Sequence, residues 1–509
     1  MEGYAAGKPA ASADAGRSVL VGELIGLVSE LTGPAAAQMS FDEIEQQVMV
    51  RGRELLRMVT QQVMDERAAG EQRRPGIAGA DGIPRTRAER GHARTVVTWF
   101  GPVTVRRLAY RAPGAPNLYP ADAALNLPVR RYSWAVQQAA VRYALAGSYE
   151  QAQLWLQDLT GISIGKQQLE QILAEAAGDA PGFYPSRPAA CCPAGLPLAI
   201  SADGKGVAMR PGARRAETAR KARHRAPQAF GSRLGTGQKA GHKRIAETGA
   251  VFDVQPPDEP RTPEQILGRA PGQSAPDGPQ AVNRWYTVQI AASRAATIAA
   301  VFDQAERRDP GHARPWIALV DGDRHQIQVI RDQAAARGIT VTILVDFIHV
   351  LEYLWKAAWC FCPPRDPAAE DWVTAQGLDI LHGRVAQVIS QIQALAAADP
   401  PRPGSEHDKI IARTLSYLQA KEPYLDYPRA LAAGWPIATG VIEGACRHLV
   451  QDRMAITGAR WSLPGAQAML WLRAIRGNGD LNQYWHWHIT QERHRNHLSR
   501  YQDGLALAA

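Results

Sequence analysis

The chain has 509 residues, of which 45% are hydrophobic and 21% are charged. This balance excludes wholesale disorder, a coiled-coil rod and a collagen-like fibre, and the length allows roughly two to four domains with buried cores. Lys and Arg (58) outnumber Asp and Glu (49), giving a net charge of +9, and nearly all the cations are Arg, whose forked guanidinium suits phosphates.

No apolar run reaches membrane-spanning length, because the best candidate, 339–362, is interrupted by residues such as Asp346 and Lys356. The N-terminus lacks the apolar core of a signal peptide. Five Cys without a CxxC pair favour neither a disulfide framework nor a zinc ribbon. We therefore expect a cytoplasmic protein without membrane contacts, associated with the nucleoid when bound to DNA.

Residues 1–94 are predicted to form N-terminal helices and a linker. After a loose tail at 1–16 come two amphipathic helices, and the second begins at Ser40 with Glu43 completing a capping box. Helices of this type pack on a core or dimerise. The second helix carries one apolar stripe, made of Phe41, Ile44, Val48, Leu55, Val59 and Val63. Residues 69–94 are rich in Gly, Pro and Arg and are predicted to be a linker.

Residues 95–180 are predicted to form a β-hairpin (95–110) followed by three helices within 132–177. The last two helices are joined by the short turn TGISIG. This pattern fits a helix-turn-helix and a plain helical hairpin equally well. We expect this mainly helical region to bind DNA.

Residues 195–362 change to a strand pattern after a Pro- and Gly-rich linker. Strands are predicted at 196–200, 245–254, 285–291, 316–320 and 339–345, with helices at 295–306, 327–337 and 347–360. Three antiparallel strands followed by parallel ones make a mixed sheet, and this α/β order is that of an RNase H-like domain. We expect a helical insertion at 363–435, and C-terminal helices of the catalytic core with a basic tail at 436–509.

Asp203 and Asp321 each follow an apolar strand of this domain. Asp-Gly is also the commonest turn after any strand, so neither residue alone indicates function. The two strands, however, are neighbours in an RNase H-like sheet, which would let the carboxylates meet and bind Mg²⁺.

Glu443 is the candidate third acid. On a helix, Ile442, Cys446 and Leu449 form an apolar stripe, and Glu443 lies on another face with Arg447, where a surface ion pair is the alternative reading. Rival acids are Asp452 in the same helix and Asp323, which we expect to face solvent.

Positive charge is concentrated in residues 204–245, with twelve Lys and Arg against Glu217. Such a block is usually a solvated loop, but beside a catalytic site it is typical of a nucleic-acid clamp. Lys205, Lys243 and Arg244 are the strongest candidates for phosphate contacts. The other candidate DNA-binding residues are Arg210, Arg214, Arg215, Lys221, Lys239, Arg447, Arg460 and Trp461. For Arg460 and Trp461, a helix-end cap and a core Trp are the preferred alternatives.

Six segments in order resemble the DDE transposases of bacterial insertion sequences, closest to the Kra-type group within the Mutator-like set. They are ADGKGVAMR (202–210), HKRIAETGAVFDV (242–254), VDGDRHQIQ (320–328), VDFIHVLEYLW (345–355), GVIEGACRHLVQDRM (440–454) and TGARWSLPGAQAMLWLRA (457–474). The resemblance covers about residues 195–490, and 95–180 more loosely.

The resemblance implies catalytic and metal-binding roles for Asp203, Asp321 and Glu443. It also implies an accessory role for Asp346 and His349, which match a Cys/Asp-x-x-His signature; a helix cap and a core His are the alternative. Two Mg²⁺ or Mn²⁺ ions would clamp the scissile phosphate. The partners would be the element's terminal inverted repeats and target DNA, with a homo-oligomer as the active complex. A catalytically inactive DNA-binding descendant and an RNase H-like nuclease are the alternatives.

The C-terminal segment YWHWHITQERHRNH contains four His. Without Cys partners, its spacing favours a basic amphipathic helix with exposed His over a zinc site.

Overall fold

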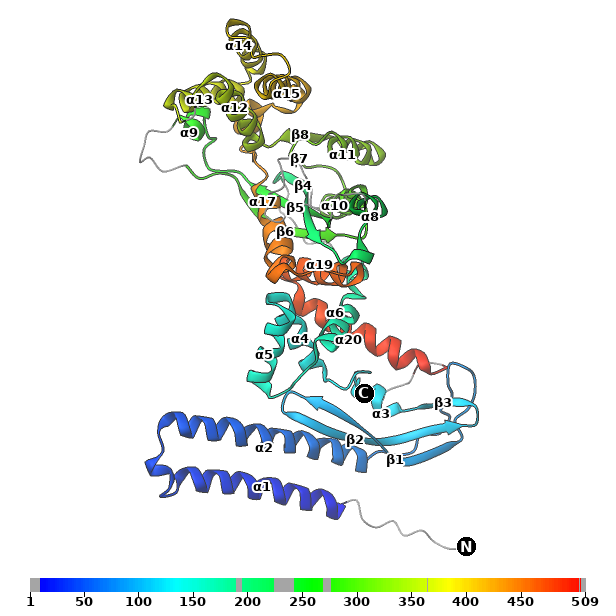
Figure 1. Ribbon diagram of the computed structural model, residues 1–509. Coiled ribbons are helices and arrows are strands. Elements are labelled where there is room, and N and C mark those ends of the chain that lie inside the picture. Colours follow the sequence, from blue (N-terminus) through cyan, green and yellow to red (C-terminus); the bar gives the residue numbers. More distant parts are fainter. Residues whose placement is uncertain are drawn as a thin grey trace. The chain divides into compact units, whose positions relative to one another are not determined.

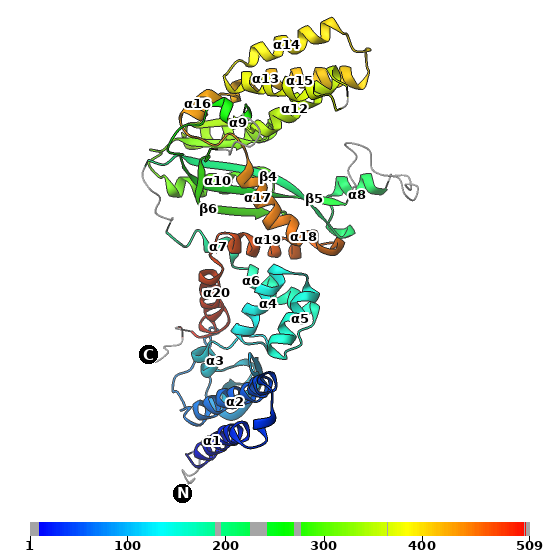
Figure 2. The ribbon, with the colours of Figure 1, turned by 90° about the vertical axis from the view of Figure 1, so that its left-hand side faces the viewer.

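The computed structural model describes residues 10–188, 195–223, 242–268, 276–363, 365–502 and 504 (Figures 1 and 2). The chain divides into two compact units. Unit 1 comprises Met1–Phe183 and Asn482–Ala509, and unit 2 comprises Tyr184–Leu481. None of the described helices combines the length and apolarity needed to cross a membrane.

Unit 1 is mainly helical and contains one small antiparallel sheet of order β1-β2-β3. Its elements are α1 (Ala10–Thr32), η1 (Ala36–Gln38), α2 (Phe41–Ala69), β1 (Arg87–Thr98), β2 (Gly101–Ala112), β3 (Ala115–Leu118), α3 (Pro120–Leu125), α4 (Trp134–Ala146), α5 (Tyr149–Thr160), α6 (Lys166–Ala177), α7 (Ala180–Phe183), α20 (Leu481–Asn496) and η6 (Leu498–Arg500). The predicted capping box is confirmed, because the backbone N–H of Ser40 donates to the Glu43 carboxylate at 2.7 Å and the Ser40 hydroxyl accepts from the N–H of Glu43. The three helices expected within 132–177 are confirmed as α4, α5 and α6.

The predicted hairpin is longer than its apolar pattern indicated. Strand β1 begins at Arg87, inside the predicted linker 69–94, and pairs Arg87 with Arg111. Most of its first half is exposed on both faces, so its sequence lacks the apolar alternation by which strands are recognised. Pairing with β2, rather than burial, holds this segment extended.

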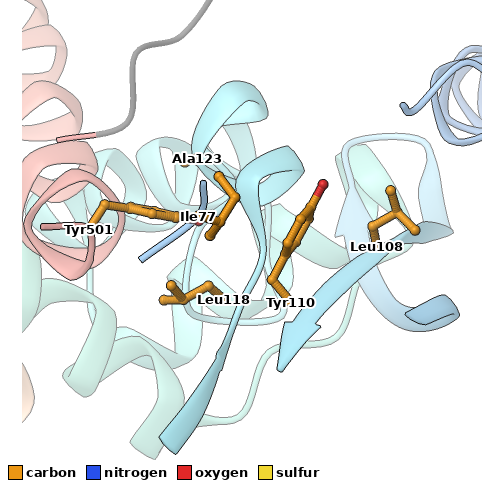
Figure 3. Packing of buried hydrophobic residues seen from close by; sticks show 6 residues of the cluster. All are labelled: Ile77, Leu108, Tyr110, Leu118, Ala123 and Tyr501. Atoms are coloured by element: carbon orange, nitrogen blue, oxygen red, sulfur yellow. The ribbon is translucent and has the colours of Figure 1, made fainter. Parts of the chain in front are cut away.

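The core of the small sheet includes residues from both ends of unit 1. Ile77, Leu108, Tyr110, Leu118, Ala123 and Tyr501 form one buried cluster (Figure 3). Helix α20 also packs in this unit, since the Tyr484 ring lies 5.1 Å from the Phe183 ring and its hydroxyl donates to the Ala176 carbonyl. The chain after Leu481 thus belongs to unit 1, whereas the sequence grouped 436–509 with the catalytic core.

Unit 2 is built on a five-stranded mixed sheet of order β6-β5-β4-β7-β8. The strands are β4 (Leu198–Ala208), β5 (Lys243–Gln255), β6 (Gln280–Gln289), β7 (Trp316–Val320) and β8 (Val341–Val345). The β4–β5 and β5–β6 pairs are antiparallel, and the β4–β7 and β7–β8 pairs are parallel. The predicted mixed α/β architecture is confirmed, and β7 has the predicted bounds.

The remaining elements of unit 2 are helices, of which α13 to α16 lie within 363–435, where the sequence predicts a helical insertion. They are η2 (Pro211–Ala213), α8 (Ala216–Arg223), α9 (Pro263–Leu267), α10 (Arg294–Arg308), α11 (Arg324–Arg337), α12 (Phe347–Phe361), α13 (Pro367–Leu381), α14 (Val385–Ala398), α15 (Glu406–Lys421), η3 (Glu422–Tyr424), α16 (Tyr427–Ala432), α17 (Gly440–Ala445), the π-helix η4 (Cys446–Gln451), α18 (Asp452–Met454), η5 (Ile456–Gly458) and α19 (Leu463–Gly477).

Two neighbouring residues of β5 show which helices cover which face. A Cβ atom at Gly249 would lie 2.3 Å from Cγ2 of Val301, so this position faces α10. The adjacent Thr248 lies beside Cys446 of η4. Because successive strand residues point to opposite faces, α10 and the α17–η4 helix lie on opposite faces of the sheet (Figure 2).

A buried ion-pair network crosses the α10 side of the sheet. Asp253 of β5 is fully buried, and its Oδ1 lies 2.7 Å from Nη2 of Arg314 and 3.9 Å from Nη1 of Arg308. Its Oδ2 accepts from the Asn283 amide at 2.8 Å. Both carboxylate oxygens are therefore satisfied away from water.

Candidate active site

Asp203 lies inside strand β4 rather than at its end. The sequence predicted a strand that stops at Ile200, but β4 continues to Ala208 because β5 pairs with it as far as Lys243. The Asp203 side chain is 27% exposed, and its Oδ1 accepts from the N–H of Gly204 at 2.6 Å. The Lys205 ammonium lies 3.7 Å from its Oδ2.

Strand register aligns three carboxylates across the parallel half of the sheet. Ser201 of β4 pairs with Leu319 of β7, so Asp203 and Asp321 each lie two residues beyond a paired position. Val320 pairs with Val345 of β8, so Asp321 and Asp346 each follow a paired position directly. The N–H of Asp346 donates to the Val320 carbonyl at 2.8 Å. The expected adjacency of the Asp203 and Asp321 strands is confirmed, and Asp346 extends the row.

Thr439 connects Glu443 to Asp346, the last of the three aligned carboxylates. The N–H of Thr439 donates to Oδ2 of Asp346 at 2.7 Å, and the Thr439 hydroxyl lies within hydrogen-bond distance of Asp346 and of Glu443, 3.1 Å from its Oε1. Ligand atoms of Asp346, His349 and Glu443 all lie within 4.8 Å of one another, a grouping able to hold a metal ion.

The helix-cap alternative is confirmed for Asp346. Asp346 is buried and caps α12, because its Oδ1 accepts from the N–H of Ile348 at 2.6 Å. His349, one turn later, is half-buried beside Glu443, and its Nδ1 has no hydrogen-bond partner among the described residues. An imidazole nitrogen beside two carboxylates has the chemistry of a metal ligand.

Asp203 lies next to Cys446, which follows Glu443 by one helical turn. Burial first, and then the neighbouring Asp203 carboxylate, raise the pKa of the Cys446 thiol to about 12. Asp203, Asp321 and Glu443 do not fall within 4.8 Å of one another as a group in the part of the chain that the structure describes. The sheet aligns the two aspartates, and the helix brings Glu443 to Asp346.

The sequence did not indicate that the helical insertion contributes to this site. A Cβ at Gly322 (φ +92°), directly after Asp321, would lie 3.1 Å from the Tyr417 hydroxyl and 3.5 Å from Cε of Lys421. Both residues are on α15, and no signal near them marks a site. The only available clue is Gly322 itself, since a left-handed glycine permits a close approach.

Lys421 is an unusual residue for a protein interior. It is only 4% exposed. Burial and Arg324 lower the pKa of its ammonium, whereas Asp323 and Asp321 raise it. A lysine this enclosed, with Asp321 and Asp323 close enough to act on its charge, is a candidate contact for an anionic ligand.

The side chains of the two rival acids are engaged with other partners, although the N–H of Asp323 donates to Oδ1 of Asp321 at 2.9 Å. Asp323 is exposed as expected, caps α11 through the N–H of Gln326 at 2.8 Å, and lies 3.1 Å from Arg294. Asp452 lies 3.4 Å from His448 on the helix surface. The alternative ion pair between Glu443 and Arg447 is not formed in the described structure, where both side chains are exposed.

The basic residues near Asp203 differ in their availability. Arg210, Arg215, Lys243, Arg447 and Arg460 are exposed, and Lys205 and Arg214 are half-buried. The Arg244 guanidinium is engaged, because it donates to the Ile290 carbonyl at 2.7 Å and to that of Ala291 at 3.2 Å. Lys239 lies outside the described residues, and Lys221 lies in α8.

Trp461 is a core residue rather than a surface for stacking a base, which corrects its inclusion among the DNA contacts. It is 6% exposed, its indole N–H donates to the Met454 carbonyl at 3.0 Å, and the Arg453 guanidinium lies 5.0 Å from its ring centre. The structure therefore supports the alternative reading for this residue.

A second acid–His group lies in unit 1. Asp179, His488 and Glu492 bring ligand atoms within 4.8 Å of one another, with His488 Nδ1 2.7 Å from Asp179. Arg495 pairs with both acids, so their charge is already compensated. His486 and His494 are exposed as expected, whereas His488 and His497 are buried, which corrects the expectation for these two. Trp134 packs against the His488 ring, and Nε2 of His497 lies 2.8 Å from the Leu127 carbonyl.

Comparison of the sequence with protein-family models gives no match, and comparison with curated proteins gives none either.

Proposed function

We propose that this protein is a metal-dependent DDE transposase that cleaves DNA at the ends of an insertion sequence and joins them to target DNA. The observation that carries the proposal is the row Asp203–Asp321–Asp346, which strand register aligns and to which Glu443 is tied through Thr439. The sheet order β6-β5-β4-β7-β8, with the first three strands antiparallel, is the order expected of an RNase H-like domain.

The donor set fits Mg²⁺ or Mn²⁺. The carboxylates supply hard oxygen ligands, and those of Asp203, Asp321 and Glu443 are partly or fully open to solvent. These three residues would hold two ions, with Asp346 and His349 in support. When bound, such ions activate a hydroxyl nucleophile and stabilise the leaving oxygen of a phosphodiester.

The surrounding cations are suited to hold the DNA backbone. Lys205 lies beside Asp203, Lys421 lies beside the loop after Asp321, and Arg210, Arg215, Arg447 and Arg460 are exposed. Lys421 orients the scissile phosphate, and the outer arginines make contacts without base preference. Binding through them weakens steeply as salt rises.

Two other functions remain as competitors. A catalytically inactive DNA-binding descendant would keep the basic surface without needing a complete carboxylate set. An RNase H-like nuclease would cut without preference for element ends, and the helical insertion contributing Lys421 argues against a compact nuclease of that kind.

The decisive test is a cleavage and strand-transfer assay on labelled element-end DNA. The wild-type chain is expected to nick at the element tip with Mg²⁺ or Mn²⁺, and to bind without cutting in EDTA. Binding without cutting in either metal would favour the catalytically inactive DNA-binding descendant. Equal cutting of unrelated duplexes would favour the nuclease.

Replacing Lys421 should reduce cleavage more than binding. We expect Lys421→Met, which keeps the side-chain length and removes the charge, to lower the cleavage rate about 10²-fold, or roughly 2.7 kcal/mol of barrier. The measurement is single-turnover cleavage together with the affinity for end DNA. Lys409→Met on the same helix is the control, and equal loss in both variants would contradict the role of Lys421.

A further inference from the structure

The helical hairpin formed by α1 and α2 exposes an unusual amount of apolar surface. Of the twenty exposed large hydrophobic residues in the described chain, twelve lie between Val19 and Val63. Helix α2 has 29 residues and buries none of them, and in the described part of α1 only Leu27 is buried. Apolar stripes that remain exposed along the described lengths of two helices mark an interaction surface.

The two helices run antiparallel. Arg17 near the start of α1 lies 2.7 Å from Glu66 near the end of α2, and Arg51 in α2 pairs with Glu30. On its other side α2 contacts strand β2, where the Gln61 amide donates to the Thr104 carbonyl at 2.9 Å. Figure 1 shows α2 between α1 and the small sheet.

The exposed stripes of both helices lie on one side of the hairpin. They comprise Val21, Leu24, Ile25 and Val28 on α1, and Met49, Leu56, Val59 and Val63 on α2. Each helical residue is rotated by about 100° from the residue before it. Leu27 on α1 and Arg51 on α2 mark the sides by which the two helices contact each other. Both stripes are centred roughly 100–130° further round the helix, in the direction of increasing residue number. Because the helices are antiparallel, equal rotations bring both stripes to the same side.

The size of this face suits a stable protein interface. With 23 residues in α1, the shared length is roughly 35 Å, and two helices side by side are about 20 Å wide. The face therefore covers on the order of 700 Å², close to the ~800 Å² that each partner contributes to a standard interface.

The charges of the hairpin favour a second copy of this chain as the partner. Residues 10–69 contain nine acids and five Arg, so the hairpin is negative in a positive protein and disfavours nucleic acid. On the apolar side of α2, exposed Glu45 and Arg67 lie near opposite ends and have no ion-pair partner among the described residues. A two-fold axis across the hairpin would set Glu45 of each copy against Arg67 of the other.

No other described segment of the chain offers a matching face, because the remaining eight exposed large hydrophobics are scattered between Ile83 and Leu395. We propose that the α1–α2 hairpin dimerises the protein, by packing its apolar face against the same face of a second copy as a four-helix bundle. This assembly goes beyond the proposed function and does not depend on it.

The test compares two double variants of the full-length chain by analytical ultracentrifugation. Ile25→Glu/Leu56→Glu places charges on the apolar face, and Val19→Glu/Val50→Glu places the same charges on the opposite side, where both valines are more than half exposed. The wild type and the control are expected to be dimers, and the first variant should dissociate with a Kd at least about 30-fold higher. Circular dichroism verifies that both variants keep their helices.

A charge exchange tests the antiparallel register. Glu45→Arg should weaken dimerisation about 2- to 5-fold, and adding Arg67→Glu should restore it. A monomeric wild-type chain at micromolar concentration, or equal dissociation of both glutamate variants, would overturn the proposal and leave this face to a different partner. A dimer whose Kd is unchanged by Glu45→Arg and by the added Arg67→Glu would overturn the antiparallel register.

Discussion

Asp203→Asn, Asp321→Asn and Glu443→Gln are each expected to lower the rate of DNA cleavage by at least about 10³-fold, or roughly 4 kcal/mol of barrier. Each amide keeps the shape of the side chain and removes the negative charge that binds a divalent cation. The measurement is single-turnover cleavage of element-end DNA in Mg²⁺, with DNA affinity measured in parallel and expected to stay within about 3-fold.

Asp323→Asn and Asp452→Asn are the matched controls for that experiment. Both acids are exposed near the site, one pairing with Arg294 and the other with His448. Asn caps a helix as well as Asp does, so α11 should keep its start at Asp323. Full activity in Asp203→Asn would remove this residue from the chemistry, and equal loss in the controls would assign the effect to net charge.

The largest expected effect on stability belongs to Asp253→Ala. The substitution leaves the guanidinium of Arg314 buried without its carboxylate partner, and uncompensated buried charge costs about 3–5 kcal/mol of unfolding free energy. Urea denaturation followed by Trp fluorescence measures the loss, because Trp285 and Trp316 lie in strands of the same sheet. The loss should appear in the unfolding of unit 2.

Asp303→Ala is the control for Asp253→Ala. Its carboxylate is 64% exposed and pairs with Arg337 at the surface, so its removal should cost less than about 1 kcal/mol. A loss for Asp253→Ala as small as that for Asp303→Ala would show that the buried network contributes little and that water reaches Arg314 after the substitution.

The sequence predicts the positions of strands best where the strand is buried, because burial determines which residues are apolar. Strand β7 was located residue for residue because all five of its residues are buried, whereas β6 (predicted at 285–291) is Gln280–Gln289, a strand with only two buried residues. Where pairing extends a strand beyond the apolar run, as in β4 after Ile200 and β1 before residue 95, the sequence carries no comparable signal.

Part of the site could be predicted from the sequence, because residues on neighbouring strands of a sheet lie close together. The alignment of Asp203 with Asp321 follows from the adjacency of β4 and β7, although Asp203 lies inside β4 and not at its end. The position of Lys421 does not follow from strand order, because it depends on how α15 packs against the loop at Gly322, and a lysine near a helix end usually lies in water. Trp461 was included among the DNA contacts because composition does not reveal that the indole N–H is already bound inside the core.

The division of the chain has a consequence for its synthesis. Unit 2 is one continuous stretch of about 300 residues, whereas unit 1 is interrupted by it. On the ribosome, Phe183 and Asp179 emerge long before Tyr484 and His488, their partners in α20. At about 5–20 residues per second this delay is roughly 15–60 s, long enough for unit 2 to fold while unit 1 still lacks its last helix.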